Sequence, residues 1–297
     1  LAISFLIIIV FATELSLPIS RMRVTALELA ASNYHTKTGI KRNDEIGDLA
    51  STIDVLSEKL LENDIQRKNL EQTRLDFFAN VSHELRTPIT VLRAYTETLI
   101  DGVVKDEDKI AQYYNRMLSE CKSMERLVGD LLVLSKMQNP DFAIEKEPVE
   151  LIQIFEDIMR SASTIAAKKN ITIDVKNDLP YCMMLGDYDR LRQMFMVILD
   201  NAIKFSKENK TVYIIISKTD KIRISIRDEG TGIEAADLEH IFDKFYKSSL
   251  RQNANGSGLG LAIAKQIALK HDGDIEVKSQ IGKGSEFIFT FPPYEID

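Results

Sequence analysis

The stretch Phe77–Thr90 combines residue types that can carry a covalently bound group on a histidine side chain. Its sequence is FFANVSHELRTPIT, and it places His83 within a predicted helix, directly before Glu84. A neutral imidazole can attack an electrophile without first losing a proton, and histidine is a competent covalent nucleophile. Thr87 lies four residues later on the same helical face, and Pro88 removes the backbone donor that would bond to the Glu84 carbonyl. We therefore expect a nucleophilic histidine on a helix that is loosened or kinked beside it.

Four segments of the C-terminal half could together hold a nucleotide. They are Arg192–Ser206, Asp228–Ile233, Phe242–Lys247 and Gly256–Leu261, with Gly282–Ser285 behind them. Glycines let backbone N–H groups approach phosphates, and the N-terminus of a helix favours anions. The chain contains neither Gly-x-Gly-x-x-Gly nor the Gly-Lys-Ser/Thr of a P-loop, which excludes the Rossmann and Walker types of site.

Three polar side chains in these segments suit the parts of a magnesium nucleotide. Asn201 offers a neutral oxygen to Mg²⁺, which takes few protein ligands and completes its shell with phosphates and water. Lys204 can neutralise phosphate charge, and Asp228 can accept a hydrogen bond from an exocyclic amine such as that of adenine. These residue types therefore suit a nucleotide bound together with Mg²⁺.

The first part of the chain predicts helices that position His83. Apolar residues spaced by three and four make a coiled-coil seam at Ile46, Leu49, Ile53, Leu56 and Leu60. The polar segment Ser32–Asn43 is expected to connect this helix to the one before it. After the charged stretch Asn63–Arg74, the helix should continue through His83.

A second helix should return alongside the His83 helix. Its apolar positions are Ile110, Tyr114, Met117, Cys121, Met124, Val128 and Leu131, again spaced by three and four. The two helices form an antiparallel hairpin whose apolar stripe is too wide for one hairpin to bury. Pairing of two hairpins makes a four-helix bundle, so we expect a homodimer.

The segment Leu1–Ala12 is nearly free of charge. A helix over these residues spans roughly 18 Å, against a bilayer core of about 30 Å, so it resembles part of a membrane helix. A signal peptide and a buried soluble helix remain alternatives at this stage. Arg21 and Arg23 follow the segment, and the excess of positive charge on cytoplasmic flanks places the rest of the chain in the cytoplasm.

After Asn139-Pro140 the pattern changes to mixed helix and strand. Helices are expected over Leu151–Lys168, Asp187–Ser206 and Ser257–Lys270, and strands over Ile171–Val175, Val212–Ser217, Ile222–Ile226, Ile275–Lys278 and Phe287–Phe291. Helices on one face of a mixed sheet make an α+β sandwich. The predicted fold class is thus a multidomain chain, all-α at first and α+β at the end.

Composition narrows the partners of this chain. Its net charge of −7 comes without any basic block, which argues against nucleic-acid binding. Cys121 and Cys182 lie far apart in apolar contexts and are expected to be buried free thiols in a reducing compartment rather than a disulfide or metal site.

The motifs together resemble those of one family. His-Glu-Leu-Arg-Thr-Pro at residues 83–88 is similar to the phospho-acceptor box of the two-component sensor histidine kinases. The four glycine-containing or polar segments resemble, in the same order, the N, G1, F and G2 boxes of the ATP-binding domain of that family, which has the Bergerat fold. Asp44-Glu45-Ile46-Gly47, at the start of the seam, resembles a HAMP signalling module.

This resemblance implies a domain order and a set of site residues. The domains would be a partial transmembrane helix over 1–17, HAMP and helical linker over 18–70, the dimerisation and phosphotransfer hairpin over 71–138 and the ATP-binding domain over 146–297. Asn201 would hold Mg²⁺, Phe205 would pack on adenine, Asp228 would bind its amine, and the stretch from Lys247 to Gly256 would form a lid. The implied ATP-binding set is Asn201, Lys204, Phe205, Asp228, Gly230, Gly232, Tyr246, Lys247, Gly256, Gly258, Leu259, Gly260 and Ser285.

The resemblance also implies an activity and its partners. ATP would phosphorylate His83, and the group would pass to an aspartate in the receiver domain of a response regulator. Glu84 would be the acid/base partner, and Thr87 would position water for a reverse, dephosphorylating reaction. Such a kinase sits in the cell membrane, with its kinase region in the cytoplasm.

One position departs from the family's pattern. The family often has a second asparagine four residues before the metal ligand, where this chain has Val197. An apolar side chain cannot coordinate Mg²⁺, so binding of metal or ATP could be weaker. A catalytically silent dimeric scaffold therefore remains an alternative. A separate alternative is a Bergerat-fold ATPase that only hydrolyses ATP.

Overall fold

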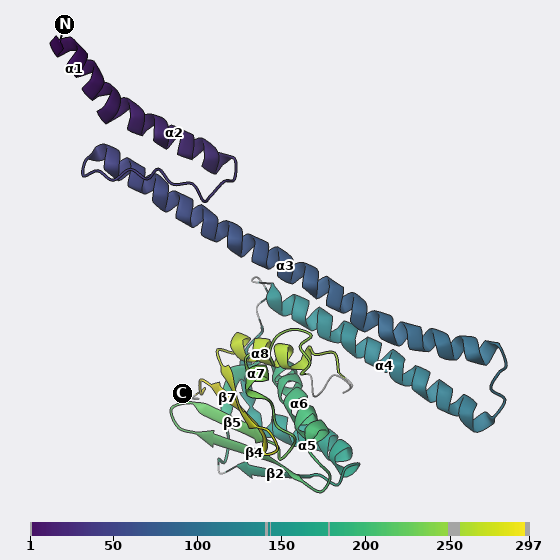
Figure 1. Cartoon of the computed structure of the whole chain (residues 1–297). Coiled ribbons are helices and arrows are strands. Elements are labelled where there is room, and N and C mark those ends of the chain that lie inside the picture. The colour runs from purple at the N-terminus through teal and green to yellow at the C-terminus, as the bar shows by residue number, and fades with distance from the viewer. Residues whose placement is uncertain (1, 140–141, 143, 178, 249–255, 295–297) are drawn as a thin grey trace. The chain divides into compact units, whose positions relative to one another are not determined.

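The computed structural model describes residues 2–139, 142, 144–177, 179–248 and 256–294 (Figure 1). The chain divides into two compact units, Leu1–Val81 and Ser82–Asp297. The long helix α3 (Glu45–Ile100) runs through the boundary between them. Each unit is described in turn.

The first unit begins with α1 (Ala2–Phe11), a π-helical turn (Ala12–Ser16) and α2 (Leu17–Ala30). Pro18 has no N–H and cannot donate to the Glu14 carbonyl, which Arg42 contacts instead through Nη1 at 3.0 Å. Arg42 also pairs with the Glu14 carboxylate at 2.8 Å and with Asp44 at 2.6 Å. The connector thus joins the end of the apolar segment to the start of α3. Among the described residues, no helix is both long and apolar enough to cross a membrane.

The connector after α2 lies against α3 through small and polar side chains. The Ser57 hydroxyl contacts the carbonyls of Tyr34 and Thr36 at 2.7 and 2.9 Å, and the Thr38 N–H donates to Asp54. Ala50 and Ser57 are 0% and 1% exposed. The predicted seam residues Leu49 and Leu56, by contrast, are 52% and 50% exposed in the single chain. Since Ala50 and Ser57 directly follow these leucines in the helix, the intramolecular contact uses a neighbouring face of α3.

The second unit begins with the helical hairpin of α3 and α4 (Glu107–Gln138). Pro88 lies inside α3, which is α-helical on both sides of it. The Asp106 side chain caps α4 by accepting from the Lys109 N–H at 3.0 Å. Of the predicted apolar stripe, Tyr114 and Val128 are 60% and 47% exposed. Cys121, expected to be buried, is also exposed in the single chain, whereas Cys182 is buried; both are free thiols. The buried side chains of α4 lie on another face, in its C-terminal half: Leu127, Leu134 and Met137.

An α+β domain follows the hairpin. Its sheet has the order β2-β4-β5-β7-β6, with β2 (Thr172–Asn177) parallel to β4 (Thr211–Lys218) and the other pairs antiparallel. The remaining strands are β5 (Ile222–Arg227), β6 (Asp274–Gln280) and β7 (Gly284–Phe291). Helices α5 (Leu151–Ala167), α6 (Tyr188–Phe205) and α8 (Gly260–Lys270) contact one another in that order and pack on the sheet, while α7 (Ala235–Leu238) is short. The predicted succession of an all-α region and an α+β domain is confirmed.

The core between helices and sheet is aromatic. The Phe195 ring of α6 lies 4.8 Å from Phe155 and 5.2 Å from Phe289, centroid to centroid, and 6.4 Å from Phe291. All four residues are at most 2% exposed. The Phe195 and Phe289 rings meet edge to face, which is a favourable arrangement for aromatic pairs. The core fixes α6, which carries Asn201, against the strands that carry the opposite wall of the site.

Two short strands were not predicted from the sequence. They are β1 (Glu147–Glu150) and β3 (Met183–Gly186), which pair antiparallel in a separate two-stranded sheet. β1 contains Pro148 and buries only Val149, so no alternation of apolar and polar residues marks it. The strands close one end of the domain beside α6.

His271 is a structural residue at this end. Its Nε2 accepts from the Asp187 N–H at 3.0 Å and its Nδ1 donates to the Ile267 carbonyl at 2.7 Å, which fixes a neutral tautomer. Its side chain is 1% exposed, and burial lowers the pKa of the imidazole. Since both ring nitrogens are engaged, His271 joins α8 to the start of α6 and is not available as a nucleophile.

Candidate nucleotide site and phospho-acceptor

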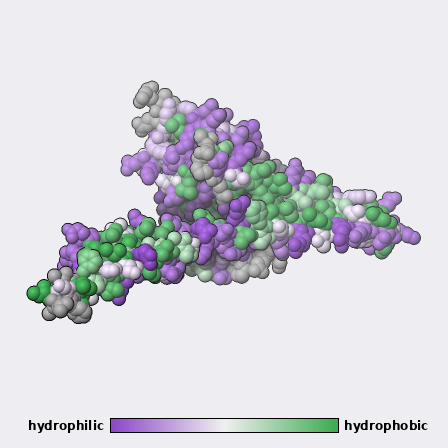
Figure 2. All heavy atoms as spheres, turned by 90° about the horizontal axis from the view of Figure 1, so that it is seen from above, coloured by the Kyte–Doolittle hydropathy of each residue, from purple (hydrophilic) through white to green (hydrophobic). Residues whose placement is uncertain are grey.

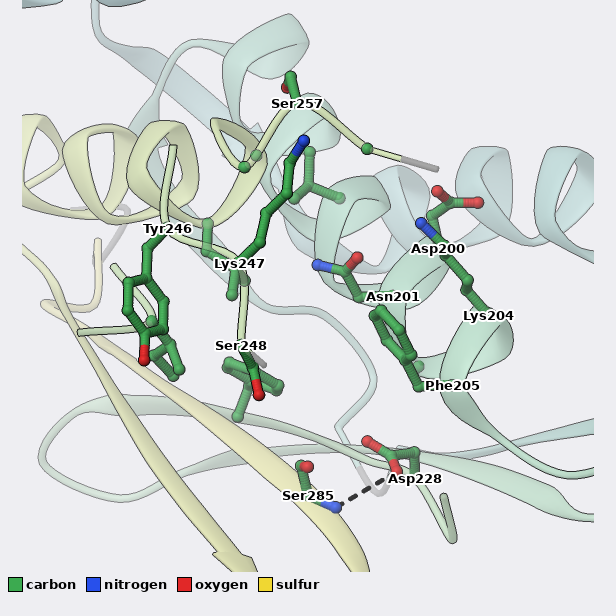
Figure 3. A pocket seen from close by; sticks show the side chains of 18 of the residues that line it. Asp200, Asn201, Lys204, Phe205, Asp228, Tyr246, Lys247, Ser248, Ser257 and Ser285 are labelled. Carbon is green, nitrogen blue, oxygen red and sulfur yellow. Dashed lines mark hydrogen bonds between the residues drawn. The ribbon is translucent and has the colours of Figure 1, made fainter. Parts of the chain in front are cut away.

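A pocket of about 220 Å³ opens where α6, α8 and the sheet meet (Figure 3). The residues that line it are Arg126, Asp130, Val197, Asp200, Asn201, Ala202, Lys204, Phe205, Asp228, Ile241, Tyr246, Lys247, Ser248, Gly256, Ser257, Gly258, Gly260, Leu261, Ser285 and Phe287. Most of the predicted ATP-binding set is therefore brought together, although its members are spread over 85 residues of sequence from 201 to 285.

Asp228 lies on the floor of the pocket, directly after β5. One carboxylate oxygen, Oδ1, accepts from the Gly230 N–H at 2.8 Å and from the Ser285 N–H at 3.2 Å. Asp228 is only 5% exposed. The two backbone donors fix the orientation of the carboxylate in this buried position. Figure 3 shows Asp228 and Ser285 together at one end of the pocket, below Phe205 and Asn201.

The opposite end of the pocket collects groups that suit phosphates. Figure 3 shows Ser257 and the ammonium group of Lys247 at this end. Helix α8 begins here, after its N-cap Leu259, and no side chain caps it. Its first N–H groups are therefore oriented for an anion, and the helix has three turns of aligned peptides behind them. A Cβ added to Gly256 would lie 3.5 Å from the Lys204 Nζ, which places a second ammonium group near the same backbone.

Two glycines of the predicted set are required by close backbone contacts. Gly258 has φ +71°, and a Cβ there would lie 2.7 Å from the Phe245 carbonyl carbon. A Cβ on Gly230 would lie 2.4 Å from the Phe205 carbonyl oxygen. Only glycine fits both places without moving backbone. Gly258 lines the pocket, whereas Gly230 shapes its floor from behind.

Three residues of the predicted set do not line the pocket. These are Gly230, Gly232 and Leu259. Gly232 has φ +74° and lies against the Gln280 carbonyl, and Leu259 is 0% exposed in the core beneath α8. They build the loops that surround the pocket. The lid expected over 247–256 falls largely on residues 249–255, which lie outside the described residues.

The phospho-acceptor candidate lies on the outer surface of α3. His83 is exposed, and its carbonyl oxygen accepts from the Thr87 hydroxyl at 3.4 Å. Glu84 forms an ion pair with Lys247: the Lys247 Nζ lies 2.7 Å from the Glu84 Oε1, with both side chains about one-quarter exposed (26% and 25%). The residue next to His83 thus contacts a residue that lines the nucleotide pocket.

Several lining residues lie outside the predicted ATP-binding set. Val197, the position that departs from the family's pattern, lies at the pocket surface, half-buried, and its Cγ1 would be 3.0 Å from a Cβ placed on Gly260. Arg126 and Asp130 reach the pocket from α4, outside the α+β domain. No local pattern could have revealed them, because their place in the pocket depends on how α4 packs against α8.

Three protein-family models match this chain in the order expected. Residues 10–62 match the HAMP domain, residues 73–140 the His Kinase A (phospho-acceptor) domain, and residues 186–295 the histidine kinase-, DNA gyrase B-, and HSP90-like ATPase. The chain belongs to the sensor histidine kinases. The second match contains His83 and the third contains all the predicted ATP-binding residues, so the family expected from the motifs is confirmed.

Individual proteins agree with this assignment. Sensor protein SrrB of Staphylococcus aureus is 37% identical over 233 residues, which are 76% of this chain and 39% of SrrB. This chain therefore corresponds to well under half of the length of that relative. The histidine kinase AdeS of Acinetobacter baumannii matches in structure with a TM-score of 0.60 at 26% identity, over 72% of this chain and 98% of AdeS.

A further solved structure shares the fold. Histidine kinase ThkA, in complex with the response regulator protein TrrA, matches with a TM-score of 0.63 at 24% identity, over 80% of this chain and 67% of ThkA.

Proposed function

We propose that this chain is an ATP-dependent protein-histidine kinase that phosphorylates its own His83. The observation that carries the proposal is the Lys247–Glu84 ion pair, because it connects the nucleotide pocket to the residue beside the acceptor. The test is transfer of label from γ-labelled ATP to His83. If the chain hydrolyses ATP but no phosphohistidine forms, the kinase proposal is wrong and the chain is only an ATPase.

The pocket supports a defined orientation of ATP. The Asp228 carboxylate is held at its end of the pocket by the two N–H groups that bind Oδ1, and it would accept from the exocyclic amine of adenine there. Phe205 lies beside it as an apolar surface for the ring. The triphosphate would then extend toward Ser257 and the start of α8. Lys204 and Lys247 offset part of its charge.

The residues at the phosphate end fit a magnesium ion. Mg²⁺ keeps several waters and binds through one or two protein oxygens together with phosphates. The Asn201 amide points into the pocket between its two ends (Figure 3), and among the described residues no cluster of three acidic, histidine or cysteine side chains competes as a metal cage. Asn201 would hold the ion, which supplies charge neutralisation to the phosphates.

We expect Val197→Asn to tighten binding of Mg·ATP. Val197 lines the pocket one helical turn before Asn201, so an amide there can reach the metal or its waters. A well-placed contact to a charged group contributes roughly 1.5–3 kcal/mol, which limits the gain to about a hundredfold. Isothermal titration of ATP at several Mg²⁺ concentrations measures the effect.

The matched control for this change is Val197→Ala, which removes the valine without adding an amide. Since Val197 is half-buried, the melting temperature of the nucleotide-free Asn variant should stay close to that of the wild type. A lower melting temperature with no gain in Mg·ATP affinity would contradict a role of this position in the metal site. It would show that the valine contributes only packing.

The transfer itself forms one bond and breaks one. A ring nitrogen of His83 bonds to the γ-phosphorus, the bond between that phosphorus and the bridging oxygen breaks, and ADP leaves. The proton displaced from the imidazole needs an acceptor, and Glu84 is the nearest candidate by sequence. Its carboxylate is engaged with Lys247 in the structure. A phosphate that attracts Lys247 would release Glu84 to accept the proton.

The acceptor of the second step is proposed to be an aspartate in the receiver domain of a response regulator. His83 lies exposed on a helix surface, which allows a second protein to approach it. ThkA, which shares the fold, is a histidine kinase found in complex with such a protein. Thr87, also exposed, would position water in the reverse reaction. To test this step, the phosphorylated chain is mixed with its receiver domain and with a receiver whose acceptor Asp is changed to Asn. The phosphoryl group should move to the first and not to the second.

A second copy of the chain is proposed to cover the hairpin. Figure 2 shows apolar side chains gathered along the α3–α4 hairpin. Exposed apolar residues there include Ile89, Tyr114, Leu118, Val128 and Leu132. Contiguous exposed apolar surface of this kind marks an interface. Sedimentation equilibrium should give a dimer, and a monomer at all concentrations would contradict the four-helix bundle.

The membrane is proposed as the site of the chain, with the kinase region on the cytoplasmic side. α1 has the sequence AISFLIIIVF and carries no charge, and Arg21 and Arg23 follow in α2. Flotation with lipid vesicles, compared between the chain and a version without residues 1–17, tests the anchor. Equal flotation of both would contradict it.

A further inference from the structure

Helix α4 contributes two charged side chains to the nucleotide pocket. Arg126 and Asp130 line the pocket, whereas the other lining residues belong to the α+β domain. α4 also contacts α8 directly. The pocket is therefore completed by a helix that lies outside the domain that binds the nucleotide in the proposed function.

Asp130 and Arg126 lie at the phosphate end of this pocket. The Asp130 Oδ2 is 3.4 Å from the Ser257 Oγ, and that hydroxyl also accepts from the Leu259 N–H at 3.3 Å. Ser257 stands at the opposite end from Asp228 in Figure 3, beside the first turn of α8. Arg126 precedes Asp130 by one helical turn and so shares its face of α4.

The two side chains differ in how their charges are balanced. Arg126 is exposed, and among the described residues it forms no ion pair. Asp130 is half-buried, and burial raises the pKa of its carboxyl group, with Arg126 and Ser257 opposing the shift. The guanidinium group is thus available to an anion, while the carboxylate would repel one. A guanidinium group binds phosphate oxygens in bidentate geometry and remains charged at all accessible pH values.

We propose that Arg126 binds the terminal phosphates of the nucleotide, so that α4 forms one wall of the phosphate site and Asp130 limits its affinity. The proposal rests on the proposed ATP site and adds a residue outside the α+β domain to it. It follows that a triphosphate holds this domain against α4 more firmly than a nucleoside does. Arg126 is a binding residue in this role, because its guanidinium group would contact the phosphates directly.

The test compares ligands that differ only in their phosphates. Binding of Mg·ATP, Mg·ADP and adenosine to the full chain is measured by isothermal titration for the wild type, Arg126→Ala and Arg126→Lys. We expect Arg126→Ala to weaken ATP about tenfold, to weaken ADP less and to leave adenosine unchanged. Arg126→Lys should recover part of the loss, because lysine keeps the positive charge but cannot bind phosphate oxygens in bidentate geometry.

Two further variants separate charge from packing. Lys122→Ala removes a cation from an exposed position on the same face of α4, one turn further from the pocket, and should leave all three affinities unchanged. Asp130→Asn keeps an oxygen for Ser257 but removes the negative charge, so it should tighten ATP, which is the opposite sign to Arg126→Ala. Hydrogen exchange of residues 123–134 should be slowed by ATP in the wild type and not in Arg126→Ala.

Several outcomes would overturn the inference. An unchanged ratio of ATP to adenosine affinity in Arg126→Ala would show that Arg126 does not contact the phosphates. An equal loss for all three ligands, or weaker ATP binding in both Arg126→Ala and Asp130→Asn, would show that α4 acts through packing. If either occurs while His83 is labelled normally, only this inference fails. If the wild type binds ATP but His83 is never labelled, the proposed function fails and the role of Arg126 is judged by the binding ratios alone.

Discussion

His83→Gln is expected to reduce labelling of the chain by γ-labelled ATP to background while leaving Mg·ATP binding unchanged. Glutamine keeps a polar side chain of helical propensity but has no nucleophilic ring nitrogen. Since His83 is exposed on α3, its replacement removes no buried contact. The nucleotide pocket does not include His83, so ATP affinity depends on other residues.

The chemical stability of the label identifies its carrier. A phosphoramidate on histidine is stable in base and lost in acid, whereas an ester on serine or threonine behaves in the opposite way. His240→Gln is the matched control, because His240 is also an exposed histidine, paired at the surface with Asp243. It should be labelled like the wild type. Base-stable, acid-labile label that persists in His83→Gln would assign the acceptor to another residue.

The regular elements of the α+β domain could be predicted because their patterns are strong. Strand β4 alternates buried Val212, Ile214 and Ile216 with more exposed neighbours, and its range agrees with the prediction to within one residue at each end. The helix predicted over Ser257–Lys270 begins later, at Gly260. The residues before it form a loop, in which the Gly258 carbonyl accepts from the Phe245 N–H. β1 and β3 were missed because they are four residues long and each is defined by its partner rather than by its own pattern.

The candidate site was predictable where a motif is local and unpredictable where it depends on packing. Asn201, Asp228 and Ser285 stand in segments with recognisable residue types, and the fold brings all three to one pocket. The apolar stripe of α4 is another such case, although the single chain leaves much of it exposed. Arg126 and Asp130 have no such signal: they lie in an ordinary amphipathic helix, and only the contact between α4 and α8 places them.

The Lys247–Glu84 ion pair could not have been predicted either, since the two residues are 163 positions apart. Each residue was assigned a separate role from its own motif, one at the nucleotide and one beside the acceptor. The structure shows a direct ion pair between these two residues. In the proposed reaction, phosphate groups would attract Lys247 away from Glu84. Nucleotide binding would therefore also release the Glu84 carboxylate.

Asp228→Asn is expected to weaken ATP binding by about 1.5–3 kcal/mol, or roughly 10- to 150-fold, and to remove the preference for ATP over GTP. The amide oxygen of asparagine can still accept from the N–H groups of Gly230 and Ser285, so it takes the place of Oδ1 and the fold is kept. The amide NH₂ then takes the place of Oδ2. The amide NH₂ and the exocyclic amine of adenine are both donors, so no hydrogen bond can form between them, and the loss is costly in a buried site.

The change from ATP to GTP gives this prediction its specificity. Guanine presents an acceptor, O6, where adenine presents its amine, so the carboxylate of the wild type disfavours GTP and the amide of the variant does not. Competition between ATP and GTP for the full chain measures the ratio directly. Asp243→Asn makes the same chemical change at an exposed position outside the pocket and should leave the ratio as it is. If Asp228→Asn melts like the wild type and keeps its ATP to GTP ratio, Asp228 does not bind the base, and the orientation proposed for the nucleotide is wrong.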